Sequence, residues 1–393
     1  MRTHGGAAVA PRGVVSAGSE AIPAAQRHAL QRDGLRFWAD DRPAIHRLRA
    51  GRGFSYRRPD GSRVRDAATL DRIRRLAIPP AWTDVRIAPS DDAHLQATGR
   101  DARGRKQYRY HAAFRARRDS LKFEQLIAFA RSLPRIRRRV QRDLALQGLP
   151  KEKVLAAVVR LLELTLVRVG NEEYARLNRS FGLTTLRDRH ARVRGSSVRF
   201  RFRAKSGQIR EVGIRDRRLA GLVGRCQDLP GQDLFQYVDE DGNQHPIASD
   251  DVNAYLREAS GIDVTAKTFR TWAATVLACR ALGALAAQTE AIEAPDGKAV
   301  VERGRGTRPS SLARRQVVAA MKLVADRLGN TPAVARQSYV HPAVVETYLD
   351  GQLGNALVRA AEDRGETAAP TPAEERAVIR LLERGSKTRK RSR

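Results

Sequence analysis

One tyrosine in the C-terminal part of the sequence stands among residues of the types that phosphoryl transfer uses. Thr331 favours the N-cap of a helix and Pro332 favours its first position, so a helix is expected to begin here. Tyr339 then projects two helical turns along, from the same face as Pro332. Asn330 stands just outside the cap, where its amide can reach an anion at the helix terminus. The pattern predicts a phenol nucleophile beside a phosphate site; the alternative is a half-buried helix tyrosine without a chemical role.

Three basic residues could supply the remaining parts of such a site. Cations must stabilise the charge on the phosphate oxygens, and a proton donor must assist the leaving oxygen. Arg168 ends an apolar segment, and Arg270 lies in a segment with aromatic neighbours. Lys205 occupies the tip of an expected hairpin, and lysine releases a proton more readily than arginine. Each also has a purely structural interpretation: an ion pair with a nearby glutamate, a helix-surface arginine and an ordinary turn lysine.

The spacing of apolar residues and turn signals predicts the elements that carry these side chains. Short strands and one helix are expected first, including a hairpin whose turn is Pro-Asp-Gly at 59–61. Helices follow, interrupted by one hairpin at 198–214, and the helix that ends with Arg168 should stop at Gly170. The predicted helices are 66–76, 121–133, 136–147, 151–169, 216–228, 249–259, 267–285, 310–328, 332–338 and 342–349.

These elements predict a division of the chain into four parts. A disordered lead-in precedes a small α+β domain with an antiparallel sheet, and a larger, mainly α catalytic domain follows. Within the catalytic domain, residues 286–309 are expected to form a connection, and a basic tail starts at Gly385. The predicted limits are 1–33 for the lead-in, 34–118 for the N-terminal DNA-binding domain, 119–352 for the catalytic domain and 353–393 for a C-terminal extension with the basic tail.

The composition indicates a polyanionic partner. The 393 residues include 74 Lys and Arg against 43 Asp and Glu, a formal net charge of +31, with a pI near 11.3. Nucleic acid is the expected partner of so basic a chain. Cys226 and Cys279 lack a second cysteine at zinc-ligand spacing, which favours a reduced, intracellular protein without structural zinc. No apolar run approaches the ~20 residues of a membrane span.

Motifs for fuelled or metal-dependent chemistry are missing from the sequence. It contains neither a phosphate-binding GxxxxGK[ST] loop nor an HExxH pair or acidic triad. A mechanism built on a tyrosine and arginines needs neither ATP nor metal, so no cofactor is expected.

Two segments have the composition of DNA-contacting surfaces. In the strand Val198–Arg203, arginines alternate with apolar residues, so that Arg201 and its basic neighbours form one outward face. The earlier segment mixes cations with amide and phenol groups that suit phosphates and base edges, although a solvated edge strand would look similar. Its members are Arg105, Lys106, Gln107, Tyr108 and Tyr110.

Taken together, the motifs resemble the type IB DNA topoisomerases, specifically the compact poxvirus-like form found in bacteria. The resemblance implies their fold, shared with tyrosine recombinases, and their reaction: one DNA strand is cut, its 3′-phosphate is held on a tyrosine, the duplex swivels and the strand is resealed. The matching segments run in family order across about 35–350: Ile78-Pro-Pro-Ala-Trp82, Gln96-Ala-Thr-Gly-Arg-Asp101, Gly104-Arg-Lys-Gln-Tyr108, Arg168-Val-Gly-Asn-Glu172, Thr184-Thr-Leu186, Phe202-Arg-Ala-Lys-Ser-Gly207, Lys267-Thr-Phe-Arg-Thr271 and Leu328 to Pro342.

The resemblance assigns a role to each candidate. It implies that Tyr339 is the nucleophile, that Arg168 and Arg270 bind the phosphate and that Lys205 is the general acid. Asn330 stands where many members have a histidine, and its amide can still donate to a phosphate oxygen. The family also implies a monomer that clamps duplex DNA in the cytoplasm, on the nucleoid. Further DNA contacts are expected from His190, Arg192 and Arg194.

Two other functions are open on the sequence alone. A tyrosine recombinase or integrase shares the chemistry, but it usually carries His-x-x-Arg where this chain has Lys267 before Arg270. A non-enzymatic architectural DNA-binding protein would explain the charge but not the ordered catalytic residues. Tyr348 is a rival nucleophile that lacks the matching context.

Overall fold

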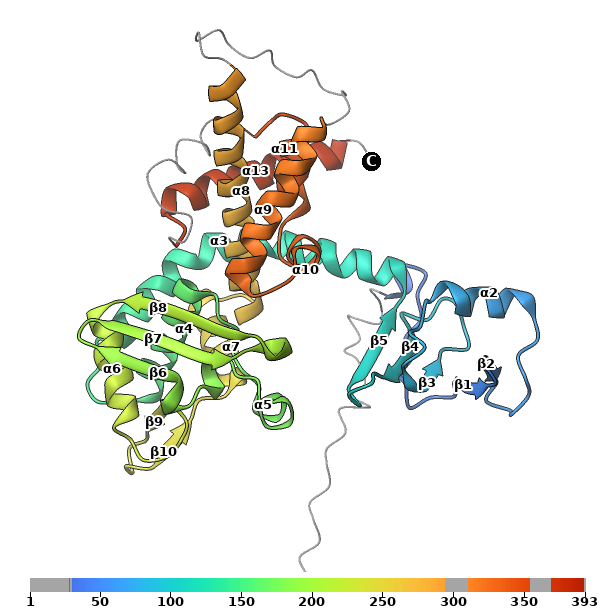
Figure 1. The fold of residues 1–393 in the computed structure, drawn as a ribbon, viewed down its shortest axis with the longest axis horizontal. Coiled ribbons are helices and arrows are strands. Elements are labelled where there is room, and N and C mark those ends of the chain that lie inside the picture. Colours follow the sequence, from blue (N-terminus) through green and yellow to red (C-terminus); the bar gives the residue numbers. More distant parts are fainter. Residues whose placement is uncertain (1–27, 29, 294–309, 354–368, 392–393) are drawn as a thin grey trace, which may run out of the picture. The chain divides into compact units, whose positions relative to one another are not determined.

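The computed structural model describes residues 28, 30–293, 310–353 and 369–391 (Figure 1). The chain separates into two compact units, Met1–Lys122 and Phe123–Arg393. The first is built around an antiparallel sheet and the second is mostly helical, which confirms the α+β class. The finer domain limits remain a prediction, and most of the expected lead-in lies outside the described residues.

The first unit holds a five-stranded sheet in the order β2-β1-β3-β4-β5, with neighbouring strands antiparallel. Ile87 and Ala97 pair across β3 and β4, and both are 0% exposed, so the core lies on this part of the sheet. Ile73 of helix α2 packs against the same core. The elements are β1 Ile45–Ala50, β2 Gly53–Arg57, α2 Ala67–Arg75, β3 Thr83–Ile87, β4 Leu95–Arg100 and β5 Lys106–Tyr110.

The predicted Pro-Asp-Gly turn forms, but a hairpin that was not predicted precedes it. β2 pairs with β1, and Gly51 makes the turn between them with a φ of +57°. The Pro-Asp-Gly sequence forms a second tight turn, after which Arg63 bridges back to Arg57. The sequence prediction missed β1 because Ile45 is the one residue of that strand that is buried, which leaves little alternation to recognise.

Two predicted helices form one continuous helix, α3 (Ala112–Leu144), which runs through Pro134. Proline in a helix interior costs about 3 kcal/mol because it removes a hydrogen bond and crowds the preceding turn. Burial of a long apolar stripe offsets this cost, since each large side chain contributes about 1.5–3 kcal/mol. The stripe continues across the proline at helical spacing through Phe129, Leu133, Ile136 and Val140.

Helix α4 (Lys151–Thr165) ends earlier than predicted, and this places Arg168 outside a helix. Leu166 takes a left-handed conformation with a φ of +54°, so Gly170 is not the residue that ends the helix. The hydroxyl of Thr165 donates to the Leu161 carbonyl at 2.6 Å and accepts from the Val167 amide at 3.2 Å. These bonds replace the next helical turn, and the chain continues in an extended conformation.

The hairpin of the second unit belongs to a three-stranded antiparallel sheet, β6-β7-β8, rather than standing alone as predicted. Its inward face packs on the main core through Val198, Phe200 and Phe202, which are 1%, 1% and 3% exposed. The strands are β6 Ala191–Arg194, β7 Ser197–Arg203 and β8 Ile209–Arg215, and a small second sheet pairs β9 Gln236–Val238 with β10 Gln244–Pro246.

The remaining helices surround this core. Those that were predicted agree closely with their expected limits except for α8, which continues beyond residue 285 because its helix-favouring Ala-rich sequence does not stop there. The helices Glu172–Asn178 and Pro372–Arg391 were not predicted. The rest of the predicted 286–309 connection lies outside the described residues. The helices are α5 Glu172–Asn178, α6 Arg217–Gln227, α7 Ser249–Ser260, α8 Ala266–Glu293, α9 Ser311–Leu328, α10 Pro332–Ser338, α11 Pro342–Leu349 and α13 Pro372–Arg391.

The C-terminal extension contributes a helix to the second unit. Helix α13 packs against α8 and α11 and includes most of the segment predicted as a basic tail (Figure 1). Arg280 and Glu374 form a bidentate ion pair with side chains only 7% and 3% exposed. No helix among the described residues is long and apolar enough to cross a membrane.

Candidate active site

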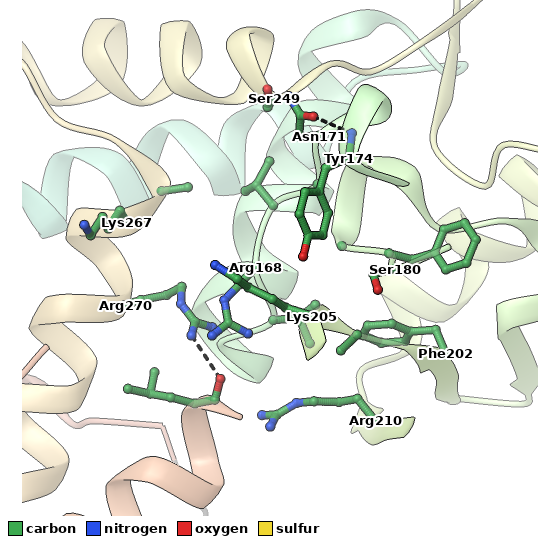
Figure 2. Close-up of a pocket in the computed structure, with 18 of the residues that line it drawn as sticks. Arg168, Asn171, Tyr174, Ser180, Phe202, Lys205, Arg210, Ser249, Lys267 and Arg270 are labelled. Atoms are coloured by element: carbon green, nitrogen blue, oxygen red, sulfur yellow. Dashed lines mark hydrogen bonds between the residues drawn. The ribbon is translucent and has the colours of Figure 1, made fainter. Parts of the chain in front are cut away.

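A cavity of about 520 Å³ in the second unit collects side chains from distant parts of the sequence (Figure 2). Among the described residues, Tyr339 lines it together with five cationic residues, and no Asp or Glu belongs to the lining. Figure 2 shows the guanidinium groups of Arg168 and Arg270 side by side. A cavity with this lining attracts anions, because its positive charges are not balanced by carboxylates. The five cations are Arg168, Lys205, Arg210, Lys267 and Arg270.

Arg168 is positioned by close backbone packing of the extended segment that follows α4. Its carbonyl accepts a hydrogen bond from the Leu183 amide at 2.8 Å. Gly182 makes this approach possible, because a Cβ atom there would lie 2.1 Å from the Val169 carbonyl oxygen and 2.6 Å from that of Arg168. Gly170, which was predicted as a helix cap, serves the same packing, since its Cβ would lie 2.5 Å from Thr185 Oγ1.

Arg270 is the most buried cation of the cavity, with 3% of its surface exposed. Its Nη2 donates to the Leu328 carbonyl at 2.9 Å and its Nη1 to that of Leu166, so its partners are dipoles and not carboxylates. Burial and the nearby charge of Arg168 lower the pKa of Arg270 to about 10. The side chain therefore stays charged at neutral pH and lacks a counter-ion in the cavity lining.

Tyr339 caps the C-terminal end of α10 instead of projecting from its second turn, as the sequence had predicted. The guanidinium carbon of Arg270 lies 5.3 Å from the centroid of the Tyr339 ring. Burial disfavours the phenolate, but the charges of Arg270 and Arg168 outweigh it, so the pKa of Tyr339 lies below its ordinary value. Thr275 fixes the backbone here, because its hydroxyl donates to the Tyr339 carbonyl at 3.3 Å and accepts from the His341 amide at 3.2 Å.

Asn330 lies beside Arg168, in the turn between α9 and α10. Its Oδ1 accepts a hydrogen bond from Arg168 Nη2, which also donates to the Gly329 carbonyl at 3.2 Å. The Nδ2 atom of Asn330 is buried and has no hydrogen-bond partner among the described residues. A buried donor without a partner is costly, and an anion bound here would satisfy it.

Lys205 stands at the tip of the hairpin between β7 and β8, in the short helical turn Lys205–Gly207. The turn is closed by the Ala204 amide, which donates to the Gln208 carbonyl at 2.8 Å, and by Gly207, whose φ of +78° suits glycine. Lys205 is exposed and lines the cavity. The cavity therefore brings Arg168, Lys205, Arg270 and Tyr339 together, with Asn330 bonded to Arg168.

Two cavity cations were not selected from the sequence: Arg210 of β8 and Lys267 in the first turn of α8. The signal for Arg210 was present. It alternates with Val212 and Ile214 on the inward side of β8, where a charged residue interrupts an apolar set. Lys267 is exposed and precedes Arg270 by one helical turn, which is the spacing that places both on one face.

The residues predicted to contact DNA from the first unit lie on β5 or directly before it, in two sets on alternate faces of the strand. Asp101 holds one set, because its carboxylate accepts from Arg105 Nε at 2.8 Å and from Gln107 Nε2 at 3.0 Å. The rings of Tyr108 and Tyr110 stack with centroids 6.1 Å apart. Lys106 pairs with Asp40, and its ammonium lies 5.9 Å from the Tyr108 ring. Their contact with DNA stays a prediction.

The predicted DNA contacts of the second unit differ in exposure. Arg192, Arg194 and Arg201 are exposed on the outer face of the sheet. His190 is only 9% exposed, and its Nδ1 accepts from the Arg187 amide at 3.0 Å, which argues against a direct DNA contact. Burial, with the charges of Arg189 and Arg187, lowers the pKa of His190 to about 4, so it is neutral at physiological pH.

Comparisons with known proteins agree with this arrangement. Residues 111–356 match the family described as eukaryotic DNA topoisomerase I, catalytic core. Residues 53–101 match the family described as bacterial DNA topoisomerase IB, N-terminal domain. The DNA topoisomerase 1B of Acanthamoeba polyphaga mimivirus is 32% identical over 308 residues, which span 77% of this chain and 87% of that protein. Every residue that lines the cavity lies inside the first matched range.

Proposed function

The chain belongs to the type IB DNA topoisomerases, and we propose that it relaxes supercoiled duplex DNA through a 3′-phosphotyrosyl intermediate on Tyr339. The single observation that supports this mechanism best is the cavity, whose described lining residues include a phenol and five cations but no carboxylate. A DNA phosphodiester carries a negative charge, and the cations of this cavity would attract it. Neither ATP nor a metal ion has a part in the proposed reaction.

In the proposed cleavage step, the phenolate oxygen of Tyr339 attacks the scissile phosphorus. The phenol has by then lost its proton to solvent, which its lowered pKa favours. A bond forms between the tyrosine oxygen and phosphorus, and the bond from phosphorus to the 5′-oxygen breaks. Arg168, Arg270 and the amide of Asn330 stabilise the charge on the non-bridging oxygens.

Lys205 supplies the proton that the leaving 5′-oxygen needs. Its exposed position at the hairpin tip allows the ammonium group to reach the far side of the phosphate from the nucleophile. Resealing is the reverse reaction: the 5′-hydroxyl returns its proton to Lys205 and attacks the phosphotyrosine. Between the two steps, torsional strain in the DNA drives rotation of the free end, so no fuel is consumed.

In the proposed cycle the duplex is held by the first unit and by the exposed arginines Arg192, Arg194 and Arg201 of the second. We infer that a monomer closes on DNA with both units and that the side chains of β5 contact the duplex. Binding depends on phosphate contacts, so it weakens steeply as salt rises. The match to the bacterial topoisomerase IB N-terminal domain supports this use of the first unit over a recombinase.

Relaxation of supercoiled plasmid with a chelator and without ATP tests the proposal. Complete relaxation under these conditions is the expected result. Recombinant products between two sites, formed without relaxation, would favour the recombinase. Binding without either reaction would favour an architectural DNA-binding protein.

A further inference from the structure

Arg210 makes a contact that the proposed reaction does not use. It lies on β8, opposite Phe202 of β7, in the hairpin whose tip is Lys205. From there its guanidinium crosses to the end of α9, donating from Nη1 to the Asp326 carbonyl at 3.1 Å and from Nη2 to that of Arg327. Figure 2 shows the side chain extended from the hairpin toward the segment that follows α9.

The end of α9 is built to receive this guanidinium. The last carbonyls of a helix lack partners within it and carry partial negative charge, so a cation is favoured there. Gly329, the C-cap, has a φ of +62°, and a Cβ atom at this position would lie 2.6 Å from Arg210 Nη1. Glycine thus serves both the left-handed turn and the close approach of the arginine.

The contact joins two parts of the site that are far apart in sequence. On one side is the hairpin with Lys205; on the other, Gly329 is followed directly by Asn330 and then by the helix that ends at Tyr339. Burial and the charges of Arg327 and Arg168 lower the pKa of Arg210, so holding this cation here is unfavourable without the carbonyls. Both Nη atoms of Arg210 donate to these carbonyls, and its Nε is buried without a hydrogen-bond partner among the described residues.

We propose that Arg210 is a positioning residue: it holds the Lys205 hairpin against the end of α9, so that Lys205 delivers its proton to the phosphate that Asn330 and Tyr339 engage. This role rests on the proposed function. A displacement of about 1 Å at a reacting group can cost 10²-fold in rate, so Arg210→Met should slow single-turnover cleavage by about 10- to 100-fold. Arg210→Lys keeps the charge but loses the paired donors, so its cleavage rate should lie between those of the parent protein and Arg210→Met.

The experiment uses two suicide DNA substrates that differ in one atom, the bridging 5′-oxygen or a 5′-sulfur at the scissile phosphate. A thiolate leaves without a proton donor, since thiols ionise near pH 8.5. If Arg210 positions Lys205, the defects of Arg210→Met and Lys205→Ala are both largely removed by sulfur. Arg218→Met is the matched control, because Arg218 is exposed on α6, and it should cleave both substrates like the parent protein.

The outcomes test the proposed function and the positioning role of Arg210 separately. A parent protein that forms no adduct contradicts the proposed function, and a Lys205→Ala variant that sulfur does not rescue contradicts the role of Lys205. Rescue of Lys205→Ala without rescue of Arg210→Met or Arg210→Lys overturns the positioning role, and so does a normal rate for Arg210→Met. If a thermal unfolding measurement shows that Arg210→Met does not fold, the rates of Arg210→Lys on the same two substrates test the positioning role.

Discussion

The Nη2 atom of Arg168 donates a hydrogen bond to Oδ1 of Asn330, and this contact orients the amide so that its Nδ2 is buried without a partner among the described residues. An unsatisfied buried donor costs about 1–3 kcal/mol. In the proposed reaction a phosphate oxygen would recover this cost, and a donor held in place before DNA arrives would stabilise charge in the transition state.

Asn330→Ala should lower the single-turnover cleavage rate by about 10²- to 10³-fold, the effect of removing one donor from an anion site. Asn330→Asp should be slower still, because its carboxylate repels the phosphate and neutralises Arg168. Asn330→His restores a donor and should recover part of the rate. Equal rates for the Ala and Asp variants would show that this side chain does not face the phosphate.

Arg168→Ala should shift the pH dependence of cleavage as well as slow it. The charge of Arg168 helps to hold the pKa of Tyr339 below its ordinary value. Its removal raises that pKa, so the rise in cleavage rate with pH should move to higher pH. Single-turnover rates across the alkaline range measure this shift, and an unchanged profile would mean that another step controls the pH dependence.

Gly182→Ala should disable the site without adding or removing a charge. The new Cβ would meet the backbone carbonyls of Val169 and Arg168, which cannot move aside as a flexible side chain could. We expect at least ~10²-fold slower cleavage from the displaced Arg168. Gly221→Ala is the control, because nothing lies within 4 Å of its Cβ position. Normal cleavage by Gly182→Ala would contradict the packing argument.

The ion pair between α8 and α13 should control stability. Glu374→Gln leaves the buried Arg280 without its carboxylate and should cost about 3–5 kcal/mol in the free energy of unfolding. Glu383 lies on the same helix as Glu374 and forms a more exposed ion pair with Arg131 of α3. Glu383→Gln should cost at most about 1 kcal/mol in the free energy of unfolding. Denaturant unfolding of the two variants measures the difference.

The same ion pair predicts the effect of acid. Burial raises the pKa of Glu374, but its bonds to Arg280 and the Thr371 amide outweigh this, so its folded pKa lies below the ordinary value. The stabilisation is therefore complete above the ordinary carboxyl pKa and is lost as pH falls through the lowered value. The stability gap between the parent protein and Glu374→Gln should shrink in that range, and a constant gap would contradict the assignment.

Local sequence signals predicted several of the elements that carry the cavity side chains. The alternation of Val198–Arg203 and the small residues after it predicted the hairpin that presents Lys205. Thr331 and Pro332 predicted the start of α10, and the structure confirms both positions. Such features depend on neighbouring residues, so the sequence records them directly.

Most of the features that were missed depend on distant contacts. Pro134 stays helical because its apolar neighbours are buried in the folded unit. The early end of α4 is an exception, because the bond from the Thr165 hydroxyl to the Leu161 carbonyl is local. The side chain of Arg210 reaches α9 more than a hundred residues away, a contact that no local pattern contains. Helix α13 was not predicted, and its last residues were assigned to a basic tail, because Glu374 finds its partner, Arg280, only in the folded unit.

The central claim is that Tyr339 is the nucleophile, and the most direct test is denaturant trapping of protein on DNA whose cleaved strand is labelled at its 5′ end, since that fragment keeps the 3′-phosphate. Tyr348 provides a matched control, since its hydroxyl donates to Gln316 Oε1 at 2.6 Å and does not line the cavity. We predict that Tyr339→Phe binds DNA normally but forms no covalent adduct, whereas Tyr348→Phe forms it. An adduct with Tyr339→Phe, or its loss only in Tyr348→Phe, would contradict the account.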